Sequence, residues 1–142
     1  MSYYVLDTDV FTLFQLDTQP VVERVEAASK AGHMVGLCTV TVEEQFTGWM
    51  KRLNTAKTGS AYATASSLFA RAIRLWGKFP IAPETEASRT TVQQFIKLKL
   101  NVGKNDLRIA SVVLDLGAIL VTRNLVDYRR IPGLKFEDWA VP

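Results

Sequence analysis

Short apolar runs alternate along this chain with longer helix-like segments, and this alternation restricts the fold more than any other feature. The clearest apolar runs cover residues 3–6, 35–40 and 118–122. Between them, apolar residues recur at helical spacing, for example over residues 61–78 and 84–100. Strands that alternate with helices favour an α/β fold with a mostly parallel central sheet.

The length and composition are those of an ordinary globular domain. The chain has 142 residues, of which 48% are hydrophobic and 22% charged, so we expect residues 1–142 to form one domain with a buried core. No apolar stretch reaches the length of a membrane span, and the N-terminal residues lack the apolar segment of a secretion signal. The single cysteine, Cys38, excludes an intramolecular disulfide and fits a reducing cytoplasm.

Carboxylates stand where several of these elements begin or end. Asp7 ends the first apolar run, Glu44 follows the second, Asp106 opens a helix-like segment, and Asp127 follows the last run together with Asn124. Side chains at the carboxyl ends of parallel strands lie at one edge of a sheet, so these groups can converge. Carboxylates without histidine or cysteine neighbours indicate a hard cation such as Mg²⁺ or Mn²⁺ and a phosphate-containing substrate.

Each acid also has a structural explanation that competes with this one. Asp7 can cap the following helix. Glu44 lies three residues after Thr41, which is the spacing of a capping box. Asp106 can stabilise the first turn of its helix, although it shares the apolar face of that helix. Asp127 can pair with a neighbouring arginine.

Several other chemistries are excluded by missing residues. His33 is the only histidine, so a metal-free mechanism with two histidines is not available. The chain has no histidine–cysteine cluster for zinc and no glycine-rich motif for nucleotide phosphates. The net charge is +3, and basic residues gather at 71–78, 97–104 and 123–130. These clusters suit a polyanionic substrate and equally an ordinary solvated surface.

The residues of five segments, and their order along the chain, resemble those of the PIN-domain ribonucleases, specifically the VapC-type toxins of bacterial toxin–antitoxin pairs. The matching segments are residues 6–9, 41–48, 105–110, 121–128 and 131–139. The resemblance implies a PIN-like three-layer α/β/α domain and an endoribonuclease that hydrolyses RNA with Mg²⁺ or Mn²⁺. It also implies a cognate antitoxin protein and a homodimer, and transfer RNA is a frequent target in that family.

The resemblance also implies which residues form the site. By position, Asp7 and Asp106 are the main metal ligands and Glu44 the third, with Glu43 as the close competitor of Glu44. Hydroxyl groups that can orient these acids stand at Thr8 and Thr122.

The fourth position of the site is divided between two residues. Many relatives have an aspartate where this chain has Asn124, and others keep asparagine there and an aspartate at the position of Asp127. The implied catalytic set is therefore Asp7, Glu44, Asp106, Asn124 and Asp127. In an RNA-cleaving enzyme of this kind, the basic residues around Arg123, Arg129 and Arg130 can hold the RNA backbone.

Two other functions stay open at this stage. Asp7 and Asp9, two residues apart after an apolar run, resemble the opening motif of haloacid-dehalogenase-like phosphatases. However, Phe11 stands where those enzymes have threonine or valine, and no late pair of acids follows. The second alternative is a PIN-like domain that only binds RNA or a partner, and Asn124 keeps this alternative open.

An aromatic stripe provides a candidate interaction surface. Tyr62, Phe69, Ile73 and Trp76 recur at helical spacing. Such a stripe can bind an antitoxin or a second copy of the chain, although it more often belongs to the core.

Overall fold

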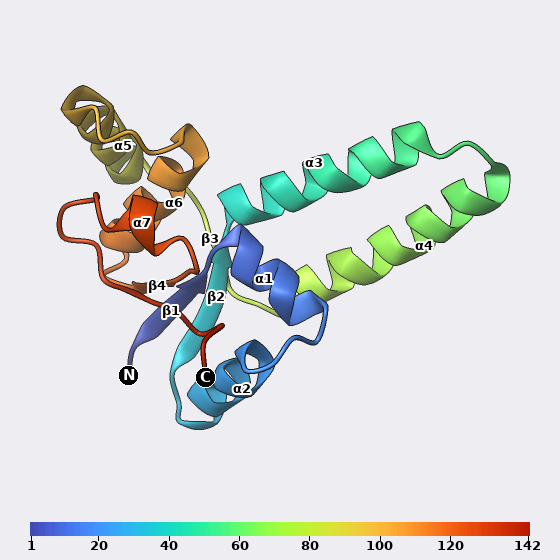
Figure 1. Cartoon of the computed structure of the whole chain (residues 1–142), viewed down its shortest axis with the longest axis horizontal. Coiled ribbons are helices and arrows are strands. Elements are labelled where there is room, and N and C mark those ends of the chain that lie inside the picture. Colours follow the sequence, from blue (N-terminus) through green and yellow to red (C-terminus); the bar gives the residue numbers. More distant parts are fainter.

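The computed structural model describes residues 1–142 as five strands and seven helices (Figure 1). The strands are β1 (Tyr3–Leu6), β2 (Met34–Cys38), β3 (Ile81–Ala82), β4 (Ile119–Val121) and β5 (Phe136–Glu137). The helices are α1 (Thr8–Gln15), α2 (Val21–Lys30), α3 (Thr39–Thr55), α4 (Gly59–Trp76), α5 (Glu86–Leu98), α6 (Lys104–Asp115) and α7 (Leu125–Tyr128).

The five strands form one sheet in the order β3-β2-β1-β4-β5, and every neighbouring pair is parallel. The central strand β1 pairs with β2 on one side and β4 on the other, so that Val5 lies opposite both Gly36 and Leu120. The chain therefore reverses its direction of winding at β1. In parallel α/β sheets, ligands bind outside the carboxyl ends of the strands at such a point.

Strand side chains alternate between two hydrophobic clusters that lie on opposite faces of the sheet. Val5 and Leu120 pack with residues of α5, α6 and α7, whereas Leu6 and Val121 pack with residues of α1, α2 and α4. Figure 1 shows these two sets of helices on either side of the strands. The three-layer α/β/α arrangement predicted from the sequence is confirmed.

Helices α3 and α4 form a long hairpin that projects from the sheet (Figure 1). Aromatic residues join the two helices, because the rings of Trp49 and Phe69 stack with centroids 5.8 Å apart. The predicted aromatic stripe is divided between core and surface. Trp76 is buried, Phe69 is partly buried, and Tyr62 and Ile73 are about half exposed.

Most elements begin and end within a few residues of the predicted positions, with one omission. The sequence did not predict α7, because a helix of four residues is too short to show a helical period. None of the helices has both the length and the hydrophobicity that a membrane span requires.

Candidate active site

A pocket of about 350 Å³ lies at the carboxyl edge of the sheet, where β1 and β4 lead into α1 and α7. Side chains from α3 and α6 also line it. Four of the five predicted site residues share its wall, and these are Asp7, Glu44, Asp106 and Asn124. The fold therefore brings together acids that are about a hundred residues apart in sequence. We call this hollow the acidic pocket.

Asp7 is both a helix cap and a wall of the acidic pocket. One carboxylate oxygen accepts a hydrogen bond from the backbone N–H of Val10 at 2.8 Å, and the other accepts one from the hydroxyl of Thr122. Only 5% of Asp7 is exposed. Burial raises the pKa of this carboxyl group to about 6, and the charges of Asp9 and Asp106 add to the increase, while both hydrogen bonds oppose it.

Glu44 points into the same pocket and does not belong to a capping box. Its Oε1 atom accepts a hydrogen bond of 2.6 Å from the hydroxyl of Thr8. Helix α3 begins at Thr39 after Cys38, so Thr41 lies inside the helix and is not its cap. The capping-box explanation is therefore wrong, because the helix is capped at Cys38, three residues before Thr41. Glu44 is instead oriented by a hydroxyl from α1.

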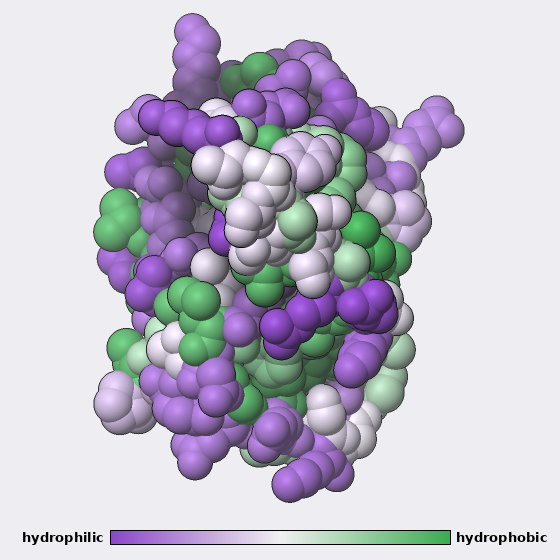
Figure 2. All heavy atoms as spheres, turned by 90° about the vertical axis from the view of Figure 1, so that its right-hand side faces the viewer, coloured by the Kyte–Doolittle hydropathy of each residue, from purple (hydrophilic) through white to green (hydrophobic).

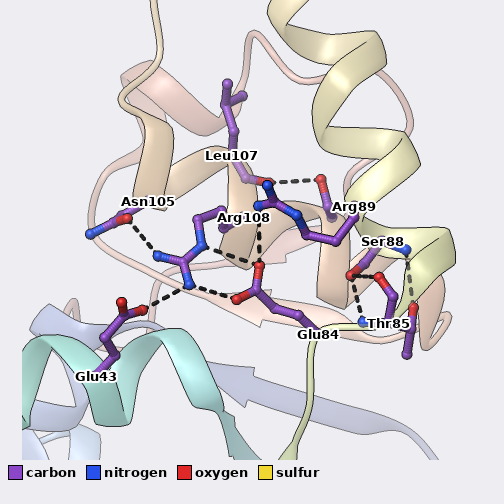
Figure 3. Close-up of polar contacts among 9 residues, drawn as sticks. Glu43, Glu84, Thr85, Ser88, Arg89, Asn105, Leu107 and Arg108 are labelled. Atoms are coloured by element: carbon purple, nitrogen blue, oxygen red, sulfur yellow. Dashed lines mark hydrogen bonds and ion pairs between the residues drawn. The ribbon is translucent and has the colours of Figure 1, made fainter.

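Glu43, the competitor of Glu44, is bound outside the acidic pocket (Figure 3). The guanidinium of Arg108 contacts Glu43 at 2.8 Å and Glu84 at 2.6 Å, and it donates to the side chain of Asn105 at 3.0 Å. These hydrogen bonds hold the pKa of Glu84 below its usual range. Figure 3 shows Arg108 between Glu43 and Glu84, and we call these residues with Arg89 the Arg108 cluster. The cluster ties α3 to α6 and leaves Glu44 for the pocket.

Asp106 lies in the first turn of α6 and is held by a tyrosine that the sequence did not single out. The hydroxyl of Tyr128 donates to Oδ1 of Asp106 at 3.1 Å, and Tyr128 is 1% exposed. Burial raises the pKa of Asp106, and the charges of Glu44 and Asp127 raise it further. The sequence feature that could have predicted this role is the position of Tyr128 in a partly apolar segment, directly after Asp127. A buried tyrosine hydroxyl requires a hydrogen-bond partner.

Asn124 and Asp127 form a linked pair, of which only Asn124 lines the pocket. The amide nitrogen of Asn124 donates to Oδ2 of Asp127 at 3.0 Å. The other oxygen of Asp127 pairs with Arg130 at 3.2 Å, which is one of the structural pairings that the sequence allowed. Asp127 thus contacts Asn124 from outside the pocket.

The acidic pocket fits a cation that keeps several water ligands better than one whose ligands all come from the protein. Its lining includes Asp7, Asp9, Glu44 and Asp106 and no lysine, arginine or histidine. Yet no three acidic, histidine or cysteine groups are arranged to hold one metal ion by themselves. Mg²⁺ keeps several of its waters and commonly takes one or two carboxylates. The hard oxygen donors therefore match such an ion, with waters completing its shell.

Two of the three arginines predicted to hold RNA are already paired with carboxylates. Arg123 contacts Asp9 at 2.7 Å, and Arg130 contacts Asp127 at 3.2 Å. Arg129 is exposed and has no carboxylate partner. The structure thus leaves one of the three free on this side of the pocket.

No protein-family model matches the sequence. Short matches to curated proteins do exist. Ribonuclease VapC1 of Haemophilus influenzae strain R2866 is 45% identical over 39 residues, which are 28% of this chain and 29% of that protein. Ribonuclease VapC2 of Rickettsia felis is 48% identical over 40 residues, which are 28% of this chain and 30% of that protein. The matched stretch thus spans less than a third of either relative.

Similarity to solved structures extends over nearly the whole chain. A chain in the crystal structure of VapBC2 from Rickettsia felis bound to a promoter DNA fragment superposes with a TM-score of 0.73 and 21% identity, over 96% of this chain and 98% of that one. For VapBC-1 from nontypeable Haemophilus influenzae the TM-score is 0.70 at 23% identity, over 98% and 99%. For FitAcB from Neisseria gonorrhoeae it is 0.69 at 20% identity, over 97% and 99%. At this level of identity, the likeness shows the fold.

Proposed function

Since the chain has the fold of the VapC-type PIN-domain toxins, we propose that it is an endoribonuclease that hydrolyses RNA with Mg²⁺ or Mn²⁺. The observation that carries this proposal is the acidic pocket, where Asp7, Glu44 and Asp106 meet without a basic residue. A divalent cation would balance the negative charge of such a pocket and would also bind the anionic phosphodiester, which the carboxylates alone would repel. The names of the curated relatives, Ribonuclease VapC1 and VapC2, support the same activity.

Each residue of the pocket has a distinct role in this mechanism. Asp7 and Asp106 would hold the cation, and the hydroxyls of Thr122 and Tyr128 fix the directions of these two carboxylates. A divalent cation held there would neutralise charge on the scissile phosphate and lower the pKa of a water. Glu44, fixed by Thr8, accepts a hydrogen bond from the attacking water and orients it.

The reaction consumes one water molecule. Its oxygen bonds to phosphorus while the bond from phosphorus to the 3′ oxygen breaks, which leaves a 5′-phosphate and a 3′-hydroxyl. Asn124 contributes a neutral amide to the pocket wall, so the unpaired charge there comes from Asp7, Glu44 and Asp106, because Asp9 pairs with Arg123.

Asp7→Asn tests this proposal directly. Asparagine caps a helix as well as aspartate does, so the variant keeps the bond to Val10 and loses the charge. We expect RNA cleavage to fall by about a hundredfold or more, with thermal stability and RNA binding retained. Asp115→Asn is the matched control, because Asp115 is exposed at the end of α6, remote from the pocket lining. Equal cleavage by wild type and Asp7→Asn would contradict metal-assisted hydrolysis.

A PIN-like domain that binds RNA without cleaving it is the second candidate function. The observation that favours it is the absence of any three groups arranged to hold a metal ion directly. In that case wild type and Asp7→Asn would bind RNA equally and neither would cleave it. The phosphatase alternative is less favoured, because both carboxylate oxygens of Asp7 accept hydrogen bonds in a site that is 5% exposed.

We propose that the partners are a cognate antitoxin and a second copy of this chain. Support for the antitoxin comes from the structural neighbours, several of which are VapBC complexes and some of which contain DNA. We also propose that the activity is cytoplasmic and acts on RNA, with transfer RNA as the first substrate to assay. Co-expression with the neighbouring open reading frames, followed by purification and light scattering, tests both partners.

A further inference from the structure

Two further hollows extend the acidic pocket along the surface between α1 and the α3–α4 hairpin. The first, of about 310 Å³, shares Thr12 and Glu44 with the acidic pocket. The second, of about 510 Å³, shares Gln15, Trp49 and Arg52 with the first. Because each hollow has lining residues in common with the next, the three lie side by side along the surface, starting at the carboxylates. We call the two further hollows the hairpin groove.

The charge changes sign along the hairpin groove. Glu44 is the only acid that lines it, and it stands at the end next to the acidic pocket. Arg52 and Arg71 line the part beyond, and neither has a carboxylate within ion-pair distance. Arg123, on the other side of the pocket, is paired with Asp9. Two of the arginines that have no carboxylate partner, Arg52 and Arg71, thus lie in the groove.

Trp49 holds one of these arginines in place. The guanidinium carbon of Arg52 lies 5.3 Å from the centre of the Trp49 ring, which in turn stacks on Phe69. A cation–π contact restricts the side chain before any ligand binds, so less entropy is lost on binding. Trp49 remains partly exposed beside the groove. Figure 2, which faces the tip of the hairpin, shows hydrophilic and hydrophobic residues interleaved on this side of the molecule.

We infer that the hairpin groove binds the RNA strand next to the scissile phosphodiester, with Arg52 and Arg71 on its phosphates and Trp49 against a base. The inference rests on the proposed ribonuclease function and adds a path for its substrate. Unpaired arginines beside a partly exposed tryptophan match the general pattern of single-strand binding sites. Leu16, Leu68 and Leu75 in the second hollow provide apolar contacts for bases.

The groove suits a single strand better than a duplex. Its two hollows have the volumes of small-molecule pockets, which admit individual nucleotides. The bases of a duplex are stacked and paired inside a rigid helix, whereas those of a single strand can turn toward an aromatic side chain. The strand therefore reaches the acidic pocket unpaired.

Fluorescence anisotropy with a labelled oligouridylate in EDTA tests this path without cleavage. We expect Arg52→Ala and Arg71→Ala each to weaken binding by about tenfold at low salt, and each to reduce the slope of log K against log salt by about 0.7. Arg74→Ala is the matched control, because Arg74 is exposed on the same helix as Arg71 and lines none of the hollows.

Trp49 is tested through its coupling to Arg52. If Trp49 acts partly by holding Arg52, the double variant loses less affinity than the two single variants combined. Trp49→Phe serves where Trp49→Ala reduces stability, since phenylalanine still stacks on Phe69. Trp76 and Trp139 are buried, so RNA binding should change the tryptophan fluorescence of wild type and not that of Trp49→Phe.

Several outcomes would overturn the inference. One is equal loss of affinity in Arg71→Ala and Arg74→Ala, because binding would then be diffuse. A duplex of the same length that binds as tightly as the single strand is another. A third is normal RNA binding by Arg52→Ala and Arg71→Ala together with lost antitoxin binding, because the groove would then be a protein site.

Failure of the proposed function gives a different result. If the protein cleaves no RNA but binds RNA in a way that depends on Arg52, the proposed ribonuclease activity is refuted and the proposed RNA path along the groove stands. Conversely, if Arg52→Ala and Arg71→Ala cleave RNA with an unchanged kcat/KM, the proposed RNA path is refuted and the proposed ribonuclease activity stands.

Discussion

Two groups of acids lie on either side of α3, and they differ in how their charge is balanced. In the Arg108 cluster, Glu43 and Glu84 each contact a guanidinium within 2.8 Å, and the pKa of Glu84 is lowered. In the acidic pocket, Asp7 and Asp106 accept hydrogen bonds from neutral hydroxyls, and the pKa of each is raised. Carboxylates are thus neutralised by arginine in the Arg108 cluster, whereas Asp7 and Asp106 in the acidic pocket have no basic partner.

Under the proposed function, the difference separates structural acids from functional ones. A pair such as Arg108 with Glu84 joins two elements and needs no ligand. Acids that are buried together without a cation destabilise one another, and they are typical of sites that bind a metal ion or transfer protons. The comparison predicts that removing an acid from the pocket reduces activity, whereas breaking the cluster reduces stability.

The largest expected effect comes from Asp106→Asn compared with Glu84→Gln. The first variant removes a charge from the pocket and should lower cleavage by about a hundredfold or more. The second removes a charge from the cluster and should leave kcat within about threefold, because Glu84 does not line the pocket. Single-turnover cleavage measured at saturating Mg²⁺ checks both. Loss of activity in both variants would erase the distinction between the two groups.

The pH dependence of stability measures the unpaired charge of Asp7. Its pKa is about 6 in the folded protein and near 3.8 in the unfolded chain. Below pH 3.8 Asp7 is protonated in both states. As the pH rises from there to about 6, the unfolded chain ionises first, so stability falls, by about 3 kcal/mol in total. Asp7→Asn should lack this decrease. The difference between wild type and Asp7→Asn in the free energy of unfolding, measured with urea in EDTA across this pH range, therefore gives the contribution of Asp7.

Added Mg²⁺ sharpens the same measurement. An ion that binds the folded protein stabilises it, and it binds ionised carboxylates. The stabilisation should therefore be larger above pH 6 than below it, and it should be much smaller in Asp7→Asn. A gain in stability that is equal at both pH values would show that the ion binds elsewhere.

Arg108→Met tests the cluster from its central residue. The variant leaves Glu43 and Glu84 without their shared partner, and Arg108 is only 17% exposed on its side chain. We expect a loss of about 2 kcal/mol in the free energy of unfolding, and a loss of activity below tenfold once the protein is folded. Arg123→Met is the control, because the Arg123–Asp9 pair is largely exposed and should contribute less than about 0.5 kcal/mol. Equal losses in both variants would contradict the structural role of the cluster.

The sequence was sufficient for the positions that follow from local patterns. Strand ends carry Asp7 and Thr122 because apolar runs stop there, and the parallel sheet then brings these ends together. Asp106 was predictable in the same way from the start of α6.

Other features depend on contacts that no local pattern contains. The choice between Glu43 and Glu44 is set by Arg108, which is more than sixty residues away in sequence. Thr41 has the spacing of a cap, but the chain enters α3 directly from β2 at Cys38, and the helix therefore starts before it. The pairing of Arg123 with Asp9 likewise appears only in the folded chain.

Tyr128→Phe has the smallest expected effect and tests the acidic pocket most finely. The substitution removes one hydroxyl and keeps the ring, which is buried in the same core cluster as residues of α6 and β4. Asp106 then loses the hydrogen bond of 3.1 Å that fixes its direction. If that bond only stabilises the fold, unfolding changes by about 1 kcal/mol and the Mg²⁺ concentration at half-maximal activity stays constant. If it orients a metal ligand, that concentration rises by about tenfold. Because the hydroxyl is neutral, the rise should persist across pH 6 to 8, which separates the loss of orientation from a change in the protonation of Asp106.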